Sequence, residues 1–225
     1  MKLTSDLLQN RLLAPLALSL MLALGAPALA GAAESEDKTS FSVTAGTLKF
    51  SSAPAMPTLP TVTLNGEAQT TNEKMTNFGV VDATGSGAGW NVTVAGQSGS
   101  GKSAVFAQYC PKATCGAEKE GYIAGGASLA PNSLTLNSTG ASFTGEKGTK
   151  EGANLPALQC SSACSADSAS AVKVVSAAKE TGMGTFKTTG FPATSLALAT
   201  PSTLKVLPSE EVYRVNLLWT LSTGP

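Results

Sequence analysis

A regular alternation of apolar and polar side chains near the C-terminus restricts the fold of this chain more than any other feature. Residues 211–222 read EVYRVNLLWTLS, and every second residue from Tyr213 to Leu221 is apolar. Side chains of a β-strand point to opposite faces in turn, so this pattern predicts a strand with one apolar face. Residues 90–95, WNVTVA, repeat the pattern, and each segment carries one of the two tryptophans. Both segments are therefore expected to bury one face in a core.

Short strand-like segments punctuated by glycine and proline continue through most of the chain. Residues 41–50 alternate, with a change of register at Gly46 that predicts a bulge or a tight turn. Residues 171–178 fit a strand or a helix, and their valines favour the strand. Residues 104–108 are expected to return as the hairpin partner of residues 90–95. Further strands are expected at residues 61–64, before an Asn-Gly turn signal, and at residues 75–82, 122–123, 133–137, 141–144, 185–187, 196–198 and 204–206.

Many short strands with frequent turns are typical of an all-β fold. We expect a single β-sandwich domain over residues 41–225, with Greek-key-like or immunoglobulin-like antiparallel sheets and long loops. A chain of this length can bury roughly 70% of its unfolded surface. The sequence therefore predicts one domain with a substantial core.

The N-terminus has the composition of a secretory signal peptide over residues 1–30. A basic start precedes an apolar run at residues 12–24, and residues 28–30 read ALA, which fits a cleavage site. We expect cleavage after Ala30, with Ala33 as the alternative, followed by a disordered stretch over residues 31–40. An uncleaved anchor is the other interpretation, but the apolar run is short for a bilayer. The prediction is an extracellular protein at the cell surface or cell wall, with no stable membrane span after cleavage.

Charge and cysteine usage limit the partners. Without residues 1–30 the chain has 13 basic and 14 acidic residues, so nucleic acid is not an expected partner.

The cysteines are Cys110, Cys115, Cys160 and Cys164. An even number in an exported chain predicts disulfides, and three pairings are possible. We expect the local pairs Cys110–Cys115 and Cys160–Cys164; a zinc site is the alternative, but these spacings fit zinc ribbons poorly.

Residues 96–103, GQSGSGKS, match the phosphate-loop pattern of nucleotide-binding proteins. That pattern needs a helix after the loop, and only a short segment separates it from Tyr109, Cys110 and Pro111. The surrounding chain also has all-β character rather than the α/β character of nucleotide-binding folds. We therefore expect a polar hairpin loop, with no nucleotide bound.

Residues for catalysis are scarce. The chain has no histidine, so a Ser-His-Asp triad and histidine metal ligands are absent from the sequence. Carboxylates are scattered, and a glycosidase with two facing carboxylates is the alternative interpretation. We expect no enzyme activity, no catalytic residues, no metal and no cofactor.

Two segments carry a resemblance to a known family. Residues 82–94, DATGSGAGWNVTV, and residues 213–225, YRVNLLWTLSTGP, resemble the WxL domain of Gram-positive surface proteins. That family has two W-x-L-type motifs, the second near the C-terminus and commonly in the setting Y-x5-W-T-L-x3-P, which residues 213–225 match. The first motif has Val92 where the family usually has leucine. The resemblance spans residues 44–225 and implies non-covalent attachment to the cell wall through peptidoglycan.

Two interpretations of the motif side chains remain open. The four residues are Trp90, Val92, Trp219 and Leu221. As core residues they would only pack, because each shares a face with further apolar side chains. As binding residues the tryptophans would stack on sugar rings. We expect a non-enzymatic module whose partners are cell-wall polysaccharide, peptidoglycan or other surface proteins. The alternative is a structural subunit of an extracellular fibre or surface layer, in which edge strands meet neighbouring subunits.

Overall fold

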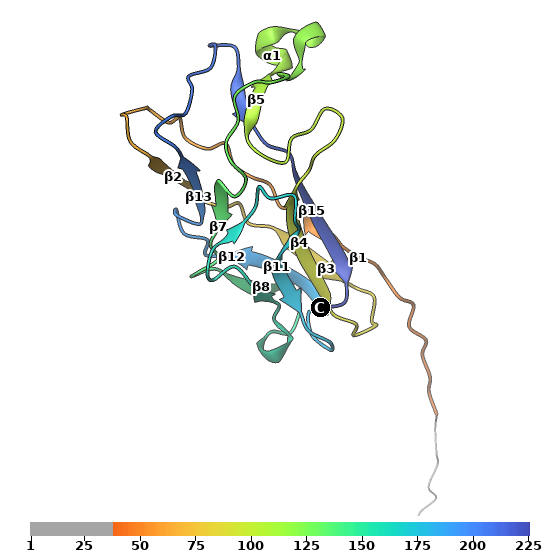
Figure 1. The fold of residues 1–225 in the computed structure, drawn as a ribbon. Coiled ribbons are helices and arrows are strands. Elements are labelled where there is room, and N and C mark those ends of the chain that lie inside the picture. The colour runs from red at the N-terminus through yellow and green to blue at the C-terminus, as the bar shows by residue number, and fades with distance from the viewer. Residues whose placement is uncertain (1–37) are drawn as a thin grey trace, which may run out of the picture. The chain divides into compact units, whose positions relative to one another are not determined.

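The computed structural model describes residues 38–225, and the chain divides after Ser42, so that Val43–Pro225 form one compact unit. The predicted signal peptide and nearly all of the predicted disordered stretch lie outside the described residues. Among the described residues, fifteen strands accompany a single helical turn, α1 (Lys112–Cys115), and two short 3-10 turns at Ala117–Lys119 and Gly152–Asn154. The all-β prediction is confirmed (Figure 1).

The strands form three four-stranded sheets and one small sheet, all antiparallel. The first sheet has the order β1 (Leu48–Ser52), β3 (Gly79–Asp82), β12 (Gly184–Thr189) and β8 (Ser142–Glu146). The second has the order β10 (Cys164–Ser165), β7 (Leu134–Leu136), β13 (Leu196–Thr200) and β2 (Gln69–Glu73). The third has the order β15 (Leu217–Thr223), β4 (Trp90–Gly96), β11 (Val172–Ala177) and β9 (Ala157–Leu158). The small sheet contains β14 (Val212–Arg214), β5 (Ala107–Cys110) and β6 (Gly121–Tyr122).

Strands that follow one another in sequence usually enter different sheets. The chain passes from β3 in the first sheet to β4 in the third, and β11, β12 and β13 lie in the third, first and second sheets in turn. Such crossings place apolar faces of separate sheets opposite one another, as in a β-sandwich. The pairing is therefore dominated by segments that are distant in sequence.

The core is built from the inward faces of these sheets. Buried residues come from all three large sheets and include Val80, Phe186, Val92, Val94, Val175, Leu134 and Leu196. Burial alternates strictly along β4, where residues 90, 92, 94 and 96 are buried and those between them are partly exposed. The aromatic ring of Phe78 lies at the centre, 6.1 Å from the ring of Phe143 and 6.2 Å from that of Trp219. The apolar alternation seen in the sequence is thus the pattern of core contact.

Several predicted strands are corrected by the structure. Residues 61–64 and 204–206 belong to no strand, and in residues 41–50 only the end of the segment enters β1. In residues 75–82 the strand begins at Gly79. Strand composition is present in each segment, but residues 61–64 and 204–206 lie beside no paired strand.

The predicted hairpin between residues 90–95 and 104–108 is also wrong. The neighbours of β4 are β15 and β11, while β5 pairs with β14 and β6. The loop between β4 and β5 does make the expected tight turn, with the Lys102 N–H donating to the Gly99 carbonyl at 3.1 Å. No helix follows this loop within the described chain before α1. The phosphate-loop pattern therefore lies outside the strand–loop–helix setting that its chemistry requires.

Candidate functional site

The two tryptophan segments, distant in sequence, are neighbouring strands. β15 pairs along its whole length with β4, and in this register Leu221 lies opposite Val92 and Trp219 opposite Val94. Same-face residues on paired strands pack against one another, so the two motifs form one apolar surface. The Asn91 side-chain amide donates to the Gly224 carbonyl at 2.7 Å and fixes the end of the terminal strand.

Trp90 lies wholly inside the core, with 0% of its surface exposed. Its indole Nε1–H donates to the Gly182 carbonyl at 3.0 Å, so the buried polar group is satisfied. The backbone of Gly182 has a φ of +73°, and a Cβ there would lie 2.6 Å from Nε1 of this indole. Glycine at this position therefore allows the backbone to approach the ring. Val92 is equally buried, so the prediction that this segment faces the core is confirmed.

Trp219 and Leu221 are only partly buried, although both pack against the core. Trp219 contacts Phe78 on its inner side and lines an apolar groove on its outer side. Of the four motif residues, Trp219 alone lines this groove. The two tryptophans, equivalent in the sequence pattern, therefore occupy different environments.

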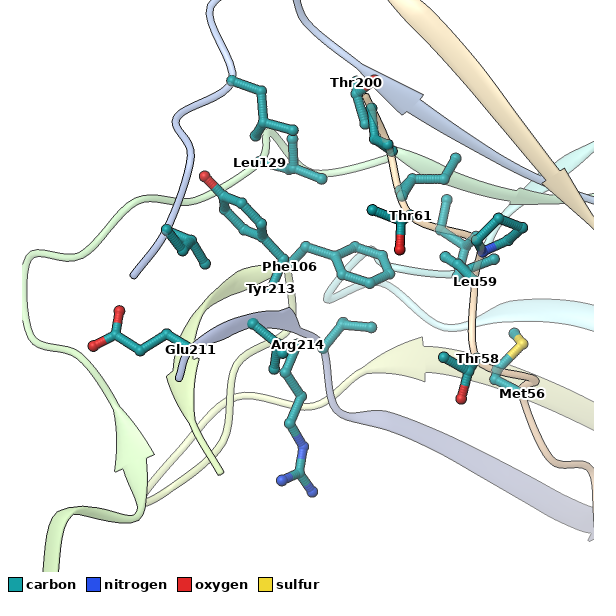
Figure 2. A pocket seen from close by; sticks show the side chains of 18 of the residues that line it. Met56, Thr58, Leu59, Thr61, Phe106, Leu129, Thr200, Glu211, Tyr213 and Arg214 are labelled. Atoms are coloured by element: carbon teal, nitrogen blue, oxygen red, sulfur yellow. The ribbon is translucent and has the colours of Figure 1, made fainter. Parts of the chain in front are cut away.

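The groove is a cavity of about 830 Å³ that opens between two extended segments (Figure 2). One wall is the proline-rich stretch of residues 54–64, and the other runs from Leu204 to Val215 and includes β14. The floor consists of side chains from the core sheets and neighbouring loops, among them Phe106, Leu129, Leu134, Leu196, Leu198 and Trp219. Its volume lies in the range of pockets that hold small molecules or short peptide segments.

The rim of the groove mixes apolar and charged side chains. Val206 is 83% exposed, and Val212 and Leu64 are also exposed large apolar residues. Lys205 and Arg214 contribute positive charge, and the carboxylate of Glu211 accepts a hydrogen bond from the Gln108 side chain. The hydroxyl of Tyr213 donates to the Lys205 carbonyl at 2.8 Å, and partial burial raises the pKa of this hydroxyl above its usual value. Apolar side chains left uncovered around a concave surface are typical of a binding site.

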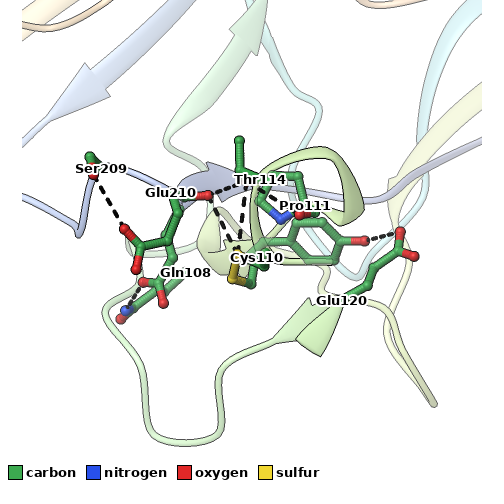
Figure 3. Close-up of a disulfide and its surroundings, with 10 residues drawn as sticks. Gln108, Cys110, Pro111, Thr114, Glu120, Ser209 and Glu210 are labelled. Atoms are coloured by element: carbon green, nitrogen blue, oxygen red, sulfur yellow. Dashed lines mark hydrogen bonds between the residues drawn. A yellow bond between two sulfur atoms is a disulfide. The ribbon is translucent and has the colours of Figure 1, made fainter. Parts of the chain in front are cut away.

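Two disulfides close short loops, and one of these loops lies beside a wall of the groove. Cys110 is bonded to Cys115, with their Cα atoms 5.8 Å apart, and Cys160 is bonded to Cys164, with Cα atoms 5.2 Å apart. The first pair closes α1 directly after β5, and Figure 3 shows Thr114 of this turn hydrogen-bonded to the Glu210 carbonyl. This contact joins the disulfide loop to the segment that leads into β14.

An aromatic cluster covers the outer part of the small sheet. The rings of Tyr109 and Tyr122 meet edge to face at 4.9 Å, and the Arg214 guanidinium lies 4.4 Å from the centre of the Tyr109 ring. The Tyr109 hydroxyl donates to Glu120 at 2.9 Å, and the Tyr122 hydroxyl donates to Asn216 at 2.5 Å. Burial raises the pKa of both hydroxyls above the usual value for tyrosine. The cluster fixes β14 and its side chains in place.

A comparison with known protein families identifies the family to which this chain belongs. The sequence matches the family described as WxL domain surface cell wall-binding over residues 34–225. The chain belongs to the WxL domain family. Searches of curated proteins and of solved structures returned no match. The WxL assignment confirms the resemblance carried by residues 82–94 and 213–225, and it associates the chain with cell-wall binding at the cell surface.

Other site chemistry is thin in the part of the WxL domain that the structure describes. Residues 38–225 contain no group of three or more His, Cys, Asp or Glu side chains able to hold a metal ion. The same residues include no helix long and apolar enough to cross a membrane. The matched family is a cell-wall-binding one rather than an enzymatic one.

The groove was missed by reasoning from the sequence. Its walls and floor come from segments that lie far apart in the chain, and no local spacing connects them. One signal was present: Pro54, Pro57 and Pro60 recur every third residue, the period of a polyproline II helix, which makes no internal hydrogen bonds. A segment with this period leaves its backbone groups open to other partners.

Proposed function

We propose that this WxL domain is an exported, non-enzymatic module that attaches non-covalently to the cell wall, with peptidoglycan as its ligand. The observation that carries the proposal is the family match over residues 34–225, which takes in the whole described sandwich. Paired cysteines support an extracellular location, because disulfides persist in oxidising compartments.

The motif residues have a structural role in this proposal. Trp90 and Val92 have no exposed surface that a glycan could reach. Leu221 lies opposite Val92 in the strand register, and together they join the last strand to the core of the third sheet. In this proposal the wall ligand binds to other groups on the surface. The motif residues pack the last strand against the core of the sandwich.

Co-sedimentation with purified cell wall tests this function. The exported chain should sediment with wall and should be released by concentrated denaturant without any covalent bond being broken. Leu221→Val keeps an apolar side chain opposite Val92, so this variant should fold and still bind wall. Trp219→Phe is the matched variant at the groove and should behave likewise.

Two results would contradict the proposal. A folded chain that stays in the supernatant at every wall concentration is not a wall binder. A folded Leu221→Val or Trp219→Phe chain that loses wall binding would place the ligand on the motifs themselves.

A structural subunit of an extracellular assembly is the second candidate. The observation in its favour is the combination of an open apolar groove with exposed apolar residues at Phe41 and Val43. A large uncovered apolar surface is uncommon on a protein that remains monomeric.

A further inference from the structure

We propose that the apolar groove of one copy of this chain is filled by the N-terminal arm, residues 39–45, of a second copy. The inference does not depend on what the domain binds in the cell wall. It is carried by three strand-like segments without strand partners, two of which form walls of the groove.

The arm has the sequence of a half-buried strand. Residues 39–45 read TSFSVTA, so Phe41, Val43 and Ala45 share one face and serine and threonine occupy the other. None of these residues donates or accepts a hydrogen bond in the described structure, and none belongs to a strand. Phe41 is 90% exposed and Val43 is 82% exposed. Burying this apolar face against a complementary apolar surface would be favourable, because it removes apolar area from water.

The walls of the groove contain backbone groups that are not paired with another strand. Residues 61–64 and 204–206 have strand composition, line the groove and pair with no other strand. Along residues 54–64 no backbone group bonds to another backbone group; only two of its carbonyls accept side-chain hydrogen bonds. β14 pairs with β5 on one side and is the outermost strand of the small sheet. An extended segment entering the groove would find free backbone groups on its walls and apolar side chains on its floor, the arrangement used in β-strand addition.

Charge favours the arm as the occupant. Residues 34–37, which precede it, read ESED and contribute three carboxylates. The rim of the groove carries Lys205 and Arg214 against the single carboxylate of Glu211, which already accepts a hydrogen bond from Gln108. A docked arm therefore brings an acidic segment towards a rim with a basic excess, and this attraction should weaken as salt is added.

The contact joins two different surfaces, an arm and a groove. Such a heterologous contact either closes by reciprocal exchange between two copies or continues from copy to copy as an open chain. In both cases the apolar floor, including the outer side of Trp219, becomes covered. The fluorescence of Trp219 should therefore change as the concentration of the chain rises.

Sedimentation of the exported chain is the first test. The unchanged chain should associate with rising concentration, and Phe41→Asp should weaken the apparent Kd by roughly tenfold or more, the loss typical of a buried aromatic at an interface. Ser42→Asp is the matched control, because it adds the same charge to the polar face of the arm. Its apparent Kd should stay close to that of the parent. Both positions are exposed and without hydrogen bonds, so neither change should affect folding.

Site-directed cross-linking is the second test. Copies carrying Val43→Cys are mixed with copies carrying Val212→Cys, a groove residue, or Ile123→Cys, an exposed residue outside the groove. The groove pair should give a linked dimer under oxidation, with far less from the control pair. Adding Phe41→Asp to the arm copy should suppress the product.

Three results would overturn the proposal. The first is a chain that stays monomeric at high concentration, or that associates equally well with Phe41→Asp. The second is a double variant, Val43→Cys with Val212→Cys, that forms its disulfide within one chain, since the arm would then fill its own groove. The third is a combination of two observations: soluble peptidoglycan fragments change the fluorescence of Trp219, and the arm variants leave association between copies unchanged. That combination would assign the groove to the wall ligand. Cell-wall co-sedimentation is measured separately, so either proposal can fail alone.

Discussion

Replacing Trp90 with alanine should come close to unfolding the domain. The side chain is fully buried, and truncating a buried tryptophan typically costs about 3–5 kcal/mol. The change also leaves the Gly182 carbonyl without its 3.0 Å indole donor, and a buried group without a partner adds roughly 1 kcal/mol or more. The edge-to-face contact with Phe143, at 6.4 Å, is lost as well. The sum of about 4–6 kcal/mol compares with the roughly 5–15 kcal/mol that a whole domain has.

Trp219→Ala is the matched comparison. This side chain is only partly buried, and the groove already leaves its outer side open, so we expect a loss of about 2–3 kcal/mol. For a domain of this size each kcal/mol lowers Tm by roughly 2–4 °C. Thermal unfolding should therefore place Trp90→Ala about 10–20 °C below the parent and Trp219→Ala clearly between the two. Equal losses in the two variants, or a Trp90→Ala chain that melts within a few degrees of the parent, would refute the reasoning.

Further predictions concern a close backbone approach, a buried carboxylate and a disulfide. Gly182→Ala should destabilise the domain strongly, because the new Cβ would lie 2.4 Å from a neighbouring Cβ. Gly85 has a similar positive φ but no atom within 4 Å of such a Cβ, so Gly85→Ala is the control. In urea unfolding it should cost only about 1 kcal/mol. Asp167→Ala removes the acceptor of the backbone amides of Ser133 and Leu134, where β7 begins, at roughly 1–3 kcal/mol for each buried donor. Burial raises the pKa of the Asp167 carboxyl in the folded protein. Its contribution to folding stability is therefore fully present below a pH of about 3.8 and is lost as the pH rises through the raised pKa. The cost of the variant should therefore be larger near pH 3 than near pH 6. Non-reducing peptide mapping should find Cys160 joined to Cys164; free thiols or a crossed pair would contradict the structure.

Local alternation predicted which residues face the core but not which strands pair. Residues 90–95 and 172–177 are strands as expected, and the apolar face from Tyr213 to Leu221 packs against the core. The terminal segment nevertheless divides between two sheets, because β14 pairs with β5 and β15 with β4. Period-two alternation shows which side chains share a face of the strand, but it does not show which strand will pair with it. Here the pairing strands lie over a hundred residues away in the sequence.

The disulfides were predictable for the opposite reason. Each pair is separated by only four or five residues, so chain connectivity alone brings the cysteines close together. The Gly182 contact with Trp90 depended instead on a turn between β11 and β12 whose position follows from the packed sheets. No spacing in the sequence linked these two residues, which lie 92 positions apart.

The failed strand predictions at residues 41–45, 61–64 and 204–206 share a physical cause. In each segment the composition favours an extended conformation, and in none of them does the structure supply a paired strand. Two of these segments line the same groove, and the third is an exposed arm. Strand composition without a partner is costly for a protein, because open edges and uncovered apolar faces invite association. In the proposed association between copies, the arm of one copy and the two groove segments of another complete each other's missing pairing.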